Sequence, residues 1–197
     1  TAYIAVRDTV EALQTLGGWY RIQYPLPLVG ITGSAGKTTT KEMIAAALEV
    51  KYHVLKTEGN KNSQVGLPQM MLRLDDSHEI AVIEMGMSEP GEMARLAAIA
   101  RPRMAVVTNI GVAHIGQLGT RENIRREKLD MIREFPDGGV LLVNGDDPLL
   151  AEIAAVRNQT GRWDSVNLSE EARAGLCRAV VRTYGTGKGM DYRASDI

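Results

Sequence analysis

Five short apolar runs recur along the chain, and longer segments with helical periodicity separate them. The runs are Leu28 to Thr32, Tyr52 to Lys56, Ile80 to Glu84, Met104 to Asn109 and Val140 to Asn144. They are almost continuous in Val, Ile, Leu and Met, which is the pattern of parallel strands covered by helices on both faces. The alternation of strand and helix predicts right-handed β-α-β units. We therefore expect an α/β fold with a mostly parallel sheet and helices on both of its faces.

The segments between these runs predict the helices. They are Lys37 to Val50, Leu67 to Leu74, Gly91 to Ala100, Arg121 to Phe135 and Pro148 to Val156. Later segments predict a loop over Arg157 to Arg173, a short helix over Ser169 to Leu176, a last strand over Ala179 to Tyr184 and an extended stretch from Tyr192 to Ile197. Before the first run, a short strand at Tyr3 to Val6 and an amphipathic helix at Thr9 to Tyr24 are expected. Residues 1–25 therefore have the character of a lead-in segment.

Composition limits the classes of protein that fit this chain. Its 197 residues, 44% of them apolar, suffice for one well-packed core. The formal net charge of -1 gives no electrostatic footprint for nucleic acid or for an acidic membrane surface. The single cysteine excludes an internal disulfide and a zinc site built from several cysteines. No apolar run approaches the roughly 20 residues of a membrane helix, so we expect a cytoplasmic protein.

The first apolar run leads into a glycine-rich loop, Gly33-Ser-Ala-Gly-Lys-Thr-Thr-Thr40. Gly33 and Gly36 can adopt backbone angles at which successive N–H groups converge on an anion at the start of the next helix. Lys37 would then contact the outer phosphates of a nucleotide, and Thr38 would offer its hydroxyl to Mg²⁺. Ile31 stands where the full P-loop pattern begins with glycine, so a flexible glycine turn is the alternative. The strand before the loop and the helix after it favour a phosphate-binding loop.

Two other strand ends carry side chains that suit a metal ion. Glu84 closes the third run, where a carboxylate faces the phosphate end of the sheet and can bind the same Mg²⁺ as Thr38. The alternative is a solvated acid. His114 follows the fourth run, which we place beside the Glu84 strand, so it would add a second metal-binding group near the phosphates. A lone histidine is nevertheless more often packed or on the surface.

Three further segments leave a structural and a functional interpretation open. The charged helix from Arg121 to Phe135 carries Lys128, which by spacing alone belongs to a solvated, salt-bridged face. Asn144 ends a strand just before a helix start at Pro148, yet its amide can bind the edge of a base. The polar loop from Asn60 to Gly66 has the composition of an ordinary turn. Its position after the second run would nevertheless allow it to lie over the γ-phosphate of a bound nucleotide.

Taken together, these segments resemble the central ATPase domain of the Mur ligases. The matching segments are Ile31 to Met43, Thr57 to Pro68, Glu84 to Met87, Pro90 to Glu92, Thr108 to Ile110, Ala113 to His114, Gly119 to Asp130 and Asn144 to Pro148. Their order and spacing together are specific, although each segment alone is not. The resemblance implies a P-loop-containing central domain of residues 26–197, with residues 1–25 as the linker from an N-terminal domain. The family's N-terminal and C-terminal domains do not fit within 197 residues.

The resemblance also implies an ATP-dependent amide-bond ligase of peptidoglycan precursor synthesis that works through an acyl phosphate. ATP would be bound by Gly33, Ser34, Ala35, Gly36, Lys37, Thr38, Thr39 and Asn144. Catalysis is assigned to Lys37, Glu84, His114 and Lys128, and metal binding to Thr38, Glu84, His114 and Lys128. Thr57, Asn60 and Asn62 would form the loop beside the acyl phosphate, and Lys128 would carry CO₂ as a carbamate. The implied partners are a UDP-linked muropeptide and D-alanyl-D-alanine, and the isolated piece would ligate poorly or not at all.

Departures from the family pattern leave the substrate open. The family often has a second Asn where this chain has Ser63, and Asn-His where it has Ser88-Glu89. A related ligase, such as a folylpolyglutamate synthetase or a muropeptide amidating partner, is the alternative among enzymes, and the flanking domains would distinguish it. The alternative that is not an enzyme is a nucleotide-binding module without catalytic activity. A pure binder needs no second metal site, so Glu84, His114 and Lys128 together argue against such a module.

Overall fold

A computed structural model describes residues 3–157 and 163–195 of the chain. Its centre is a seven-stranded sheet in the order β2-β3-β1-β4-β5-β6-β7, in which every pair of neighbouring strands is parallel. The strands are β1 (Leu28–Thr32), β2 (Val54–Lys56), β3 (Ile80–Glu84), β4 (Met104–Val107), β5 (Val140–Asn144), β6 (Val180–Gly185) and β7 (Tyr192–Arg193). Strand β1 pairs Ile31 with Glu84 of β3 and Thr32 with Val107 of β4. The expected placement of the fourth run directly beside the Glu84 strand is therefore wrong, because β1 lies between them. The carboxyl ends of these three strands therefore meet at one edge of the sheet, where such folds bind ligands.

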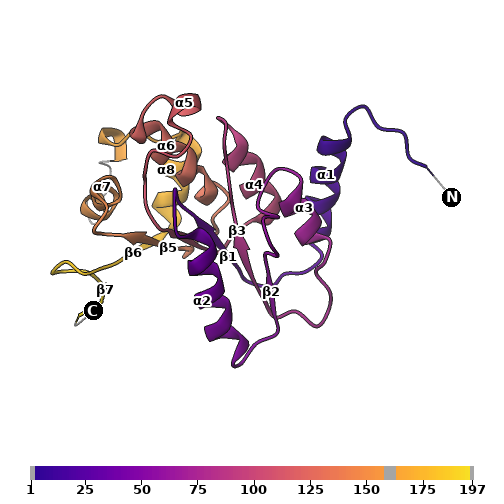
Figure 1. Cartoon of the computed structure of the whole chain (residues 1–197), viewed down its shortest axis with the longest axis horizontal. Helices are drawn as coiled ribbons and strands as arrows, with labels where there is room; N and C mark the ends of the chain where they lie inside the picture. The colour runs from indigo at the N-terminus through magenta and orange to yellow at the C-terminus, as the bar shows by residue number, and fades with distance from the viewer. Residues whose placement is uncertain (1–2, 158–162, 196–197) are drawn as a thin grey trace.

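Helices connect the strands and cover the sheet. They are α1 (Thr9–Arg21), α2 (Lys37–Glu49), α3 (Gly66–Met71), α4 (Glu92–Ala100), α5 (Ile115–Leu118), α6 (Arg121–Leu129), α7 (Pro148–Val156) and α8 (Glu170–Arg178). Figure 1 shows α1, α3 and α4 at one end of the molecule and α7 with β7 at the other. Among the described residues, no helix combines the length and the apolar character that crossing a membrane requires.

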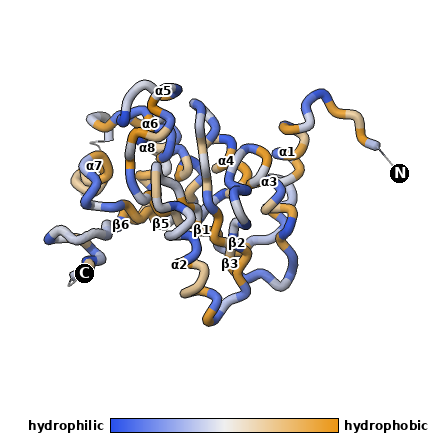
Figure 2. The backbone as a smooth tube through the Cα atoms, viewed as in Figure 1, coloured by the Kyte–Doolittle hydropathy of each residue, from blue (hydrophilic) through white to orange (hydrophobic). Residues whose placement is uncertain are grey.

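Two apolar clusters hold the helices to opposite faces of the sheet. The larger one contains Leu28 and Ile83 together with side chains of α3, α4, α6, α7 and α8. The smaller one contains Val29 and Val82 together with Ala45 of α2. Successive strand residues thus pack against different helices, which explains why the strands are apolar throughout. Figure 2 shows hydrophobic strands inside and hydrophilic stretches in the outer loops, so the expected α/β fold with helices on both faces is confirmed.

A buried arginine attaches α1 to the domain. Arg21 is 6% exposed, and its guanidinium donates to Ala100 O and Leu26 O at 2.9 Å each and also to Tyr24 O. Gly17 allows the close approach of α1 to α3, because a Cβ there would lie 2.9 Å from Pro68 Cα. The helix therefore packs closely against the rest of the described chain and ends at Arg21, three residues earlier than expected.

Several expected elements are wrong or differ in length. Tyr3 to Val6 form no strand, because they extend away from the sheet and Tyr3 is 90% exposed. The helix expected from Arg121 ends at Leu129 and tightens into a 3₁₀ turn, Asp130–Ile132, in which Arg133 N donates to Asp130 O at 3.2 Å. The helix expected up to Leu74 likewise ends at Met71 in short-range hydrogen bonds. The short helix α5 lies in a segment expected to be a loop.

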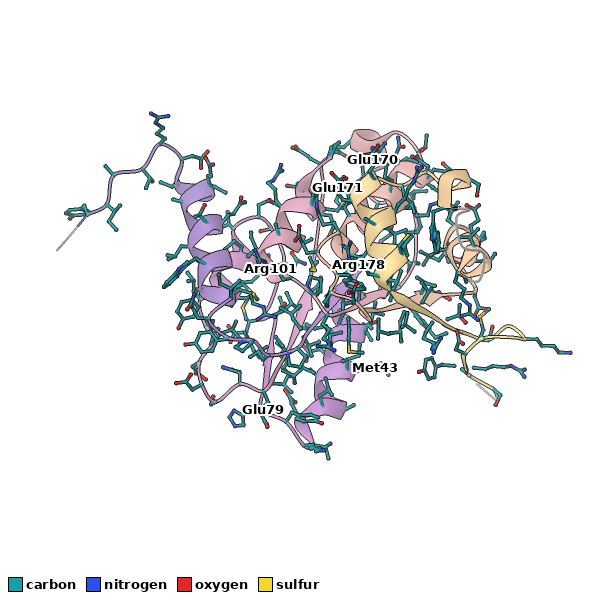
Figure 3. The ribbon with its side chains drawn as sticks, turned by 180° about the vertical axis from the view of Figure 1, so that it is seen from behind. Met43, Glu79, Arg101, Glu170, Glu171 and Arg178 are labelled. Carbon is teal, nitrogen blue, oxygen red and sulfur yellow. The ribbon has the colours of Figure 1, made fainter. Side chains whose placement is uncertain are left out.

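The last third of the chain follows the expectations in part. Residues 158–162 of the loop expected at Arg157 to Arg173 lie outside the described residues, as do residues 196–197 of the last extended stretch. Ser169 is the N-cap of α8, accepting from Ala172 N. Figure 3 shows Glu170 and Glu171 at the start of this helix and Arg178 at its end. Acids at the start and a base at the end interact favourably with the helix dipole. The strand expected at Ala179 to Tyr184 forms as β6, one residue further along the chain.

Candidate functional site

Two glycines give the loop before α2 its shape. Gly33 has a φ of +152°, and a Cβ there would lie 1.8 Å from Thr108 Oγ1, so only glycine lets the loop pass this close to the segment after β4. Gly36 is left-handed, with a φ of 78°, directly before the helix. In the described chain the N–H groups of Gly36 to Thr39 have no acceptor. Together with the positive end of the helix dipole, they fit an anion such as phosphate.

Lys37 lies over the loop that precedes it. Its Nζ donates a 3.0 Å hydrogen bond to Gly33 O, which holds the ammonium group beside the N–H groups. Thr38 and Thr39 follow on the exposed first turn of α2. The loop and its lysine thus have the arrangement that the sequence predicts for phosphate binding.

Glu84 is a buried carboxylate beside this loop. It is 2% exposed, and its Oε2 accepts a 2.9 Å hydrogen bond from Thr38 Oγ1. Its Oε1 accepts a 2.7 Å hydrogen bond from Asn62 Nδ2. Both donors are neutral, so they leave the negative charge uncompensated, and a buried charge without a counter-charge costs free energy. A hard cation would remove this cost, so the carboxylate and the Thr38 hydroxyl together fit Mg²⁺.

The segment that carries Asn62 is attached to both Glu84 and α2. Thr57 is buried, and its Oγ1 accepts a 2.9 Å hydrogen bond from Glu84 N. Its carbonyl oxygen accepts a 2.7 Å hydrogen bond from Nζ of Lys41, a lysine that is only 2% exposed. Of the three residues expected in the substrate loop, the structure brings Thr57 and Asn62 to Glu84 and leaves Asn60 exposed.

Replacing Lys41 with methionine is expected to lower the free energy of unfolding by about 1–3 kcal/mol, because the buried carbonyl of Thr57 loses its donor and Glu42 loses an ion pair. Urea denaturation monitored by circular dichroism measures the change. The matched control is Lys51→Met, since Lys51 is an exposed lysine just beyond the same helix. Equal denaturation midpoints for the two variants would show that the Lys41 hydrogen bond does not hold this segment.

A cavity of about 300 Å³ opens beside the Glu84 cluster. Four of the candidate residues line it: Lys37, Asn62, His114 and Lys128. They come from α2, from the loop before α3, from the loop after β4 and from α6, so only the fold brings them together. A cavity of this size next to a phosphate loop has room for a charged group of a substrate.

Lys128 is a buried lysine of this cavity, so the solvated position expected from its spacing is wrong. It is 2% exposed, and its Nζ forms no hydrogen bond within the described chain. Burial, followed by repulsion from Lys37, lowers the pKa of Lys128 to about 8, and Glu127 opposes this shift. The lowered pKa favours the neutral, nucleophilic form of this amine.

His114 lies at the rim of the same cavity. It is exposed and has a φ of 65° and a ψ of 20°, a left-handed conformation that is uncommon outside glycine. The His, Cys, Asp and Glu side chains of the described residues form no group of three that would hold a metal ion by themselves. Any magnesium site must therefore also use hydroxyl, phosphate or water oxygens, as Mg²⁺ usually does.

Asn144 lies away from the cavity, at the end of β5. Its Nδ2 donates to Thr108 O and its Oδ1 accepts from Asp146 N, both at 3.0 Å. Asp147 caps α7 and Pro148 is the first residue of that helix, so the helix start expected at Pro148 is confirmed. Because β4 separates β5 from β1, Asn144 reaches the other side of the phosphate loop from Glu84.

Two residues to which sequence reasoning gave no role support this site. Gln64 connects helices, since its side chain accepts from Gln14 Nε2 of α1 and donates to Glu92 O of α4, both at 3.0 Å. Glu127 accepts hydrogen bonds from the N–H groups of Gly91 and Met93 at the start of α4. The only sequence signal for either residue is a polar side chain in a polar loop or a charged helix.

Comparison with known proteins places the chain in a family. The sequence profile described as the Mur ligase middle domain matches residues 31–193. Over 196 residues the chain is 42% identical to the UDP-N-acetylmuramoyl-tripeptide--D-alanyl-D-alanine ligase of Bacillus subtilis, covering 100% of this chain and 38% of that protein. The chain thus spans well under half the length of this relative.

Solved structures agree with the sequence comparison. A crystal structure of MurF from Acinetobacter baumannii superimposes with a TM-score of 0.82 at 34% identity, over 98% of this chain and 38% of that one. MurF from Thermotoga maritima, solved in complex with ADP, has a TM-score of 0.78 at 33% identity, over 98% of this chain and 40% of that one.

A more distant likeness concerns the fold alone. Folylpolyglutamate synthase of Mycobacterium tuberculosis superimposes with a TM-score of 0.58 at 16% identity, over 89% of this chain and 45% of that one. This likeness does not favour the folylpolyglutamate alternative. The profile match over most of the chain, together with the phosphate loop and the Glu84 cluster, shows that this chain belongs to the Mur ligase middle domain family.

Proposed function

We propose that this chain is the ATP-binding part of an ATP-dependent carbon–nitrogen ligase of peptidoglycan precursor synthesis. The observation that carries the proposal is the hydrogen bond between Thr38 of the phosphate loop and the buried carboxylate of Glu84. This pair joins an anion site to a cation site, which is what Mg·ATP requires. The ADP bound to the Thermotoga maritima relative supports the nucleotide.

The residues of the site would act mainly by positioning and by neutralising charge. The N–H groups from Gly36 to Thr39 would hold phosphate oxygens, and Lys37 would compensate the charge that develops when the terminal phosphate is transferred. Asn62 and the cavity would face the carboxylate to be phosphorylated. The acyl phosphate formed there would then be attacked by an amine, with phosphate as the leaving group.

Mg²⁺ would be held by Thr38 and Glu84, with His114 and Lys128 near a second ion. When bound, it would neutralise phosphate charge and orient the terminal phosphate. The buried, uncompensated carboxylate supports the first position. The second position is supported only by His114 and Lys128 lining one cavity.

We propose that Lys128 carries a carbamate. Its neutral Nζ would attack the carbon of CO₂, forming an N–C bond and releasing one proton to solvent. The product is an anion, which would convert a buried cation into a ligand for a metal ion. The support is an amine that is 2% exposed, lines the cavity and has no hydrogen bond to give up within the described chain.

The remaining assignments concern the longer protein. We propose residues 1–25 as a linker from an N-terminal domain, residues 26–197 as the central domain, and a C-terminal domain that completes the enzyme. The substrates would be a UDP-linked muropeptide and D-alanyl-D-alanine, as the name of the Bacillus subtilis relative suggests, and the enzyme would work in the cytoplasm. Asn144 would contact adenine, although its amide is engaged with Thr108 and Asp146.

Isothermal calorimetry with a non-hydrolysable ATP analogue tests the nucleotide site. We expect binding that requires Mg²⁺ and that weakens about tenfold or more in Lys37→Ala, because the loop loses its cation. Lys51→Ala is the control, since Lys51 is an exposed lysine just beyond the end of α2 that lies opposite the phosphate loop. Binding without Mg²⁺, or equal binding by wild type and Lys37→Ala, would contradict the proposal.

A further inference from the structure

The side chain of Asn109, in the loop after β4, forms several hydrogen bonds with the phosphate loop. Its Oδ1 accepts hydrogen bonds from Ser34 N at 3.1 Å and from Ala35 N at 3.0 Å. Its Nδ2 donates to Ala35 O at 3.3 Å, and its own carbonyl accepts from Ser34 N at 3.1 Å. One amide thus satisfies both donors and an acceptor in the first half of the loop.

This arrangement divides the N–H groups of the loop into two sets. Those of Ser34 and Ala35 point at Asn109, whereas those of Gly36 to Thr39 have no acceptor in the described chain. We infer that Asn109 is a positioning residue of the nucleotide site, an inference that rests on the proposed function. It holds the first half of the loop in shape and leaves the phosphates to the N–H groups of Gly36 to Thr39. Ser34 and Ala35 would then contribute shape, not hydrogen bonds, to ATP binding.

The segment that carries Asn109 is itself held firmly. Thr108 Oγ1 donates to Ala35 O at 2.6 Å, and Gly111 N donates to Ser34 Oγ at 2.8 Å. On its other side, Ile110 N donates to the buried carboxylate of Asp147 at 2.8 Å. Asn109 is therefore a fixed acceptor between β4 and the start of α7, able to order a glycine-containing loop before a ligand arrives.

A neutral amide suits this position better than the isosteric carboxylate. Aspartate would accept from Ser34 N and Ala35 N equally well, but it cannot donate to Ala35 O. It would also place a negative charge beside the site of the phosphates, and like charges at short range repel. Asn109→Asp and Asn109→Ala consequently separate two effects, because the first keeps the acceptor and adds charge while the second removes the acceptor.

Residue-resolved amide hydrogen exchange measured by NMR tests the inference on this chain. In wild type we expect slow exchange of the Ser34 and Ala35 amides without nucleotide. Mg·ATP should slow amide exchange at Gly36 to Thr39 about tenfold or more. It should change the exchange rates of Ser34 and Ala35 by less than about threefold relative to that of Thr40. Thr40 N is bonded to Gly36 O at 3.0 Å and reports general stabilisation of this helix end.

The two variants should respond differently. In Asn109→Ala, Ser34 and Ala35 should exchange about tenfold faster without nucleotide, and Mg·ATP affinity should fall about tenfold because binding must now order the loop. In Asn109→Asp, exchange at these amides should stay slow while Mg·ATP affinity falls about tenfold through repulsion. A purely structural role would not give this separation of exchange from affinity.

Different failures identify which idea is wrong. Suppose that wild type binds Mg·ATP and that amide exchange at Ser34 and Ala35 then slows as strongly as at Gly36 to Thr39. Phosphate would then displace Asn109, which overturns the inference but leaves the proposed function standing. Wild-type affinity in both variants would overturn it as well. If wild type binds no Mg·ATP, the proposed function fails and takes the inference with it.

Discussion

Replacing Glu84 with glutamine is expected to weaken Mg·ATP binding at least about tenfold, ~1.4 kcal/mol, while raising the free energy of unfolding. The amide keeps the shape of the side chain and can still bond to Thr38 and Asn62. It removes a buried negative charge whose two hydrogen-bond donors among the described residues are neutral and which Mg²⁺ would neutralise. Calorimetry with and without Mg²⁺ measures the first effect, and urea denaturation measures the second.

The control for this variant is Glu79→Gln. Glu79 is an exposed acid next to the opposite end of β3, remote from the phosphate loop (Figure 3). Its replacement should leave Mg·ATP affinity unchanged. If Glu84→Gln binds Mg·ATP as wild type does, Glu84 is not a metal ligand. A fall in both affinity and stability would instead indicate that the carboxylate is needed for folding.

Replacing Lys128 with methionine in the longer ligase is expected to reduce ligation about 100-fold or more, with less than about a threefold change in Mg·ATP affinity. Methionine fills a similar buried volume, so the cavity should keep its shape. What is lost is the amine, and with it the anionic carbamate that would act during phosphoryl transfer. Steady-state kinetics with saturating and limiting ATP separates the two parameters. Full activity in this variant would exclude a catalytic role for Lys128.

The carbamate itself should show a pH dependence that follows from the buried amine. CO₂ reacts only with the neutral form, and burial lowers the pKa of Lys128 to about 8 from the ordinary 10.5. At a fixed CO₂ pressure, a carbamate signal from ¹³C-labelled CO₂ should therefore grow as the pH rises towards 8. The signal should vanish in Lys128→Met and persist in Lys51→Met. Persistence in Lys128→Met would mean that another amine carries it.

The fold could be predicted from the sequence because its signals are local. Each strand of the sheet interior is a short apolar run, and the helices between strands other than α5 lie in segments with helical periodicity. The errors occurred where a local signal was overridden or missing. Tyr3 to Val6 have a strand-like composition but no neighbouring strand in the described chain, and the Arg121 helix ends early because Asp130 begins a tighter turn.

The site was predictable in its parts and not in its contacts. Gly33 to Thr38 follow a spacing that specifies a phosphate loop, and Glu84 stands at a strand end that parallel pairing brings beside it. The resemblance to the family supplied Lys128, whose spacing indicates only a solvated helix face. Nothing in the sequence predicted that Lys128 is buried, because its burial depends on helices packed around α6.

The sequence by itself determined the succession of strands and helices along the chain, the phosphate loop and the edge of the sheet at which the polar residues gather. These properties depend on periodicity and spacing over a few residues. Only the tertiary structure decided that Thr38 and Asn62 are the neutral partners of Glu84, and that Asn109 occupies the N–H groups of Ser34 and Ala35. Thr38 and Glu84 are 46 positions apart and Ala35 and Asn109 are 74 apart, so their contacts arise only when the parallel strands pair.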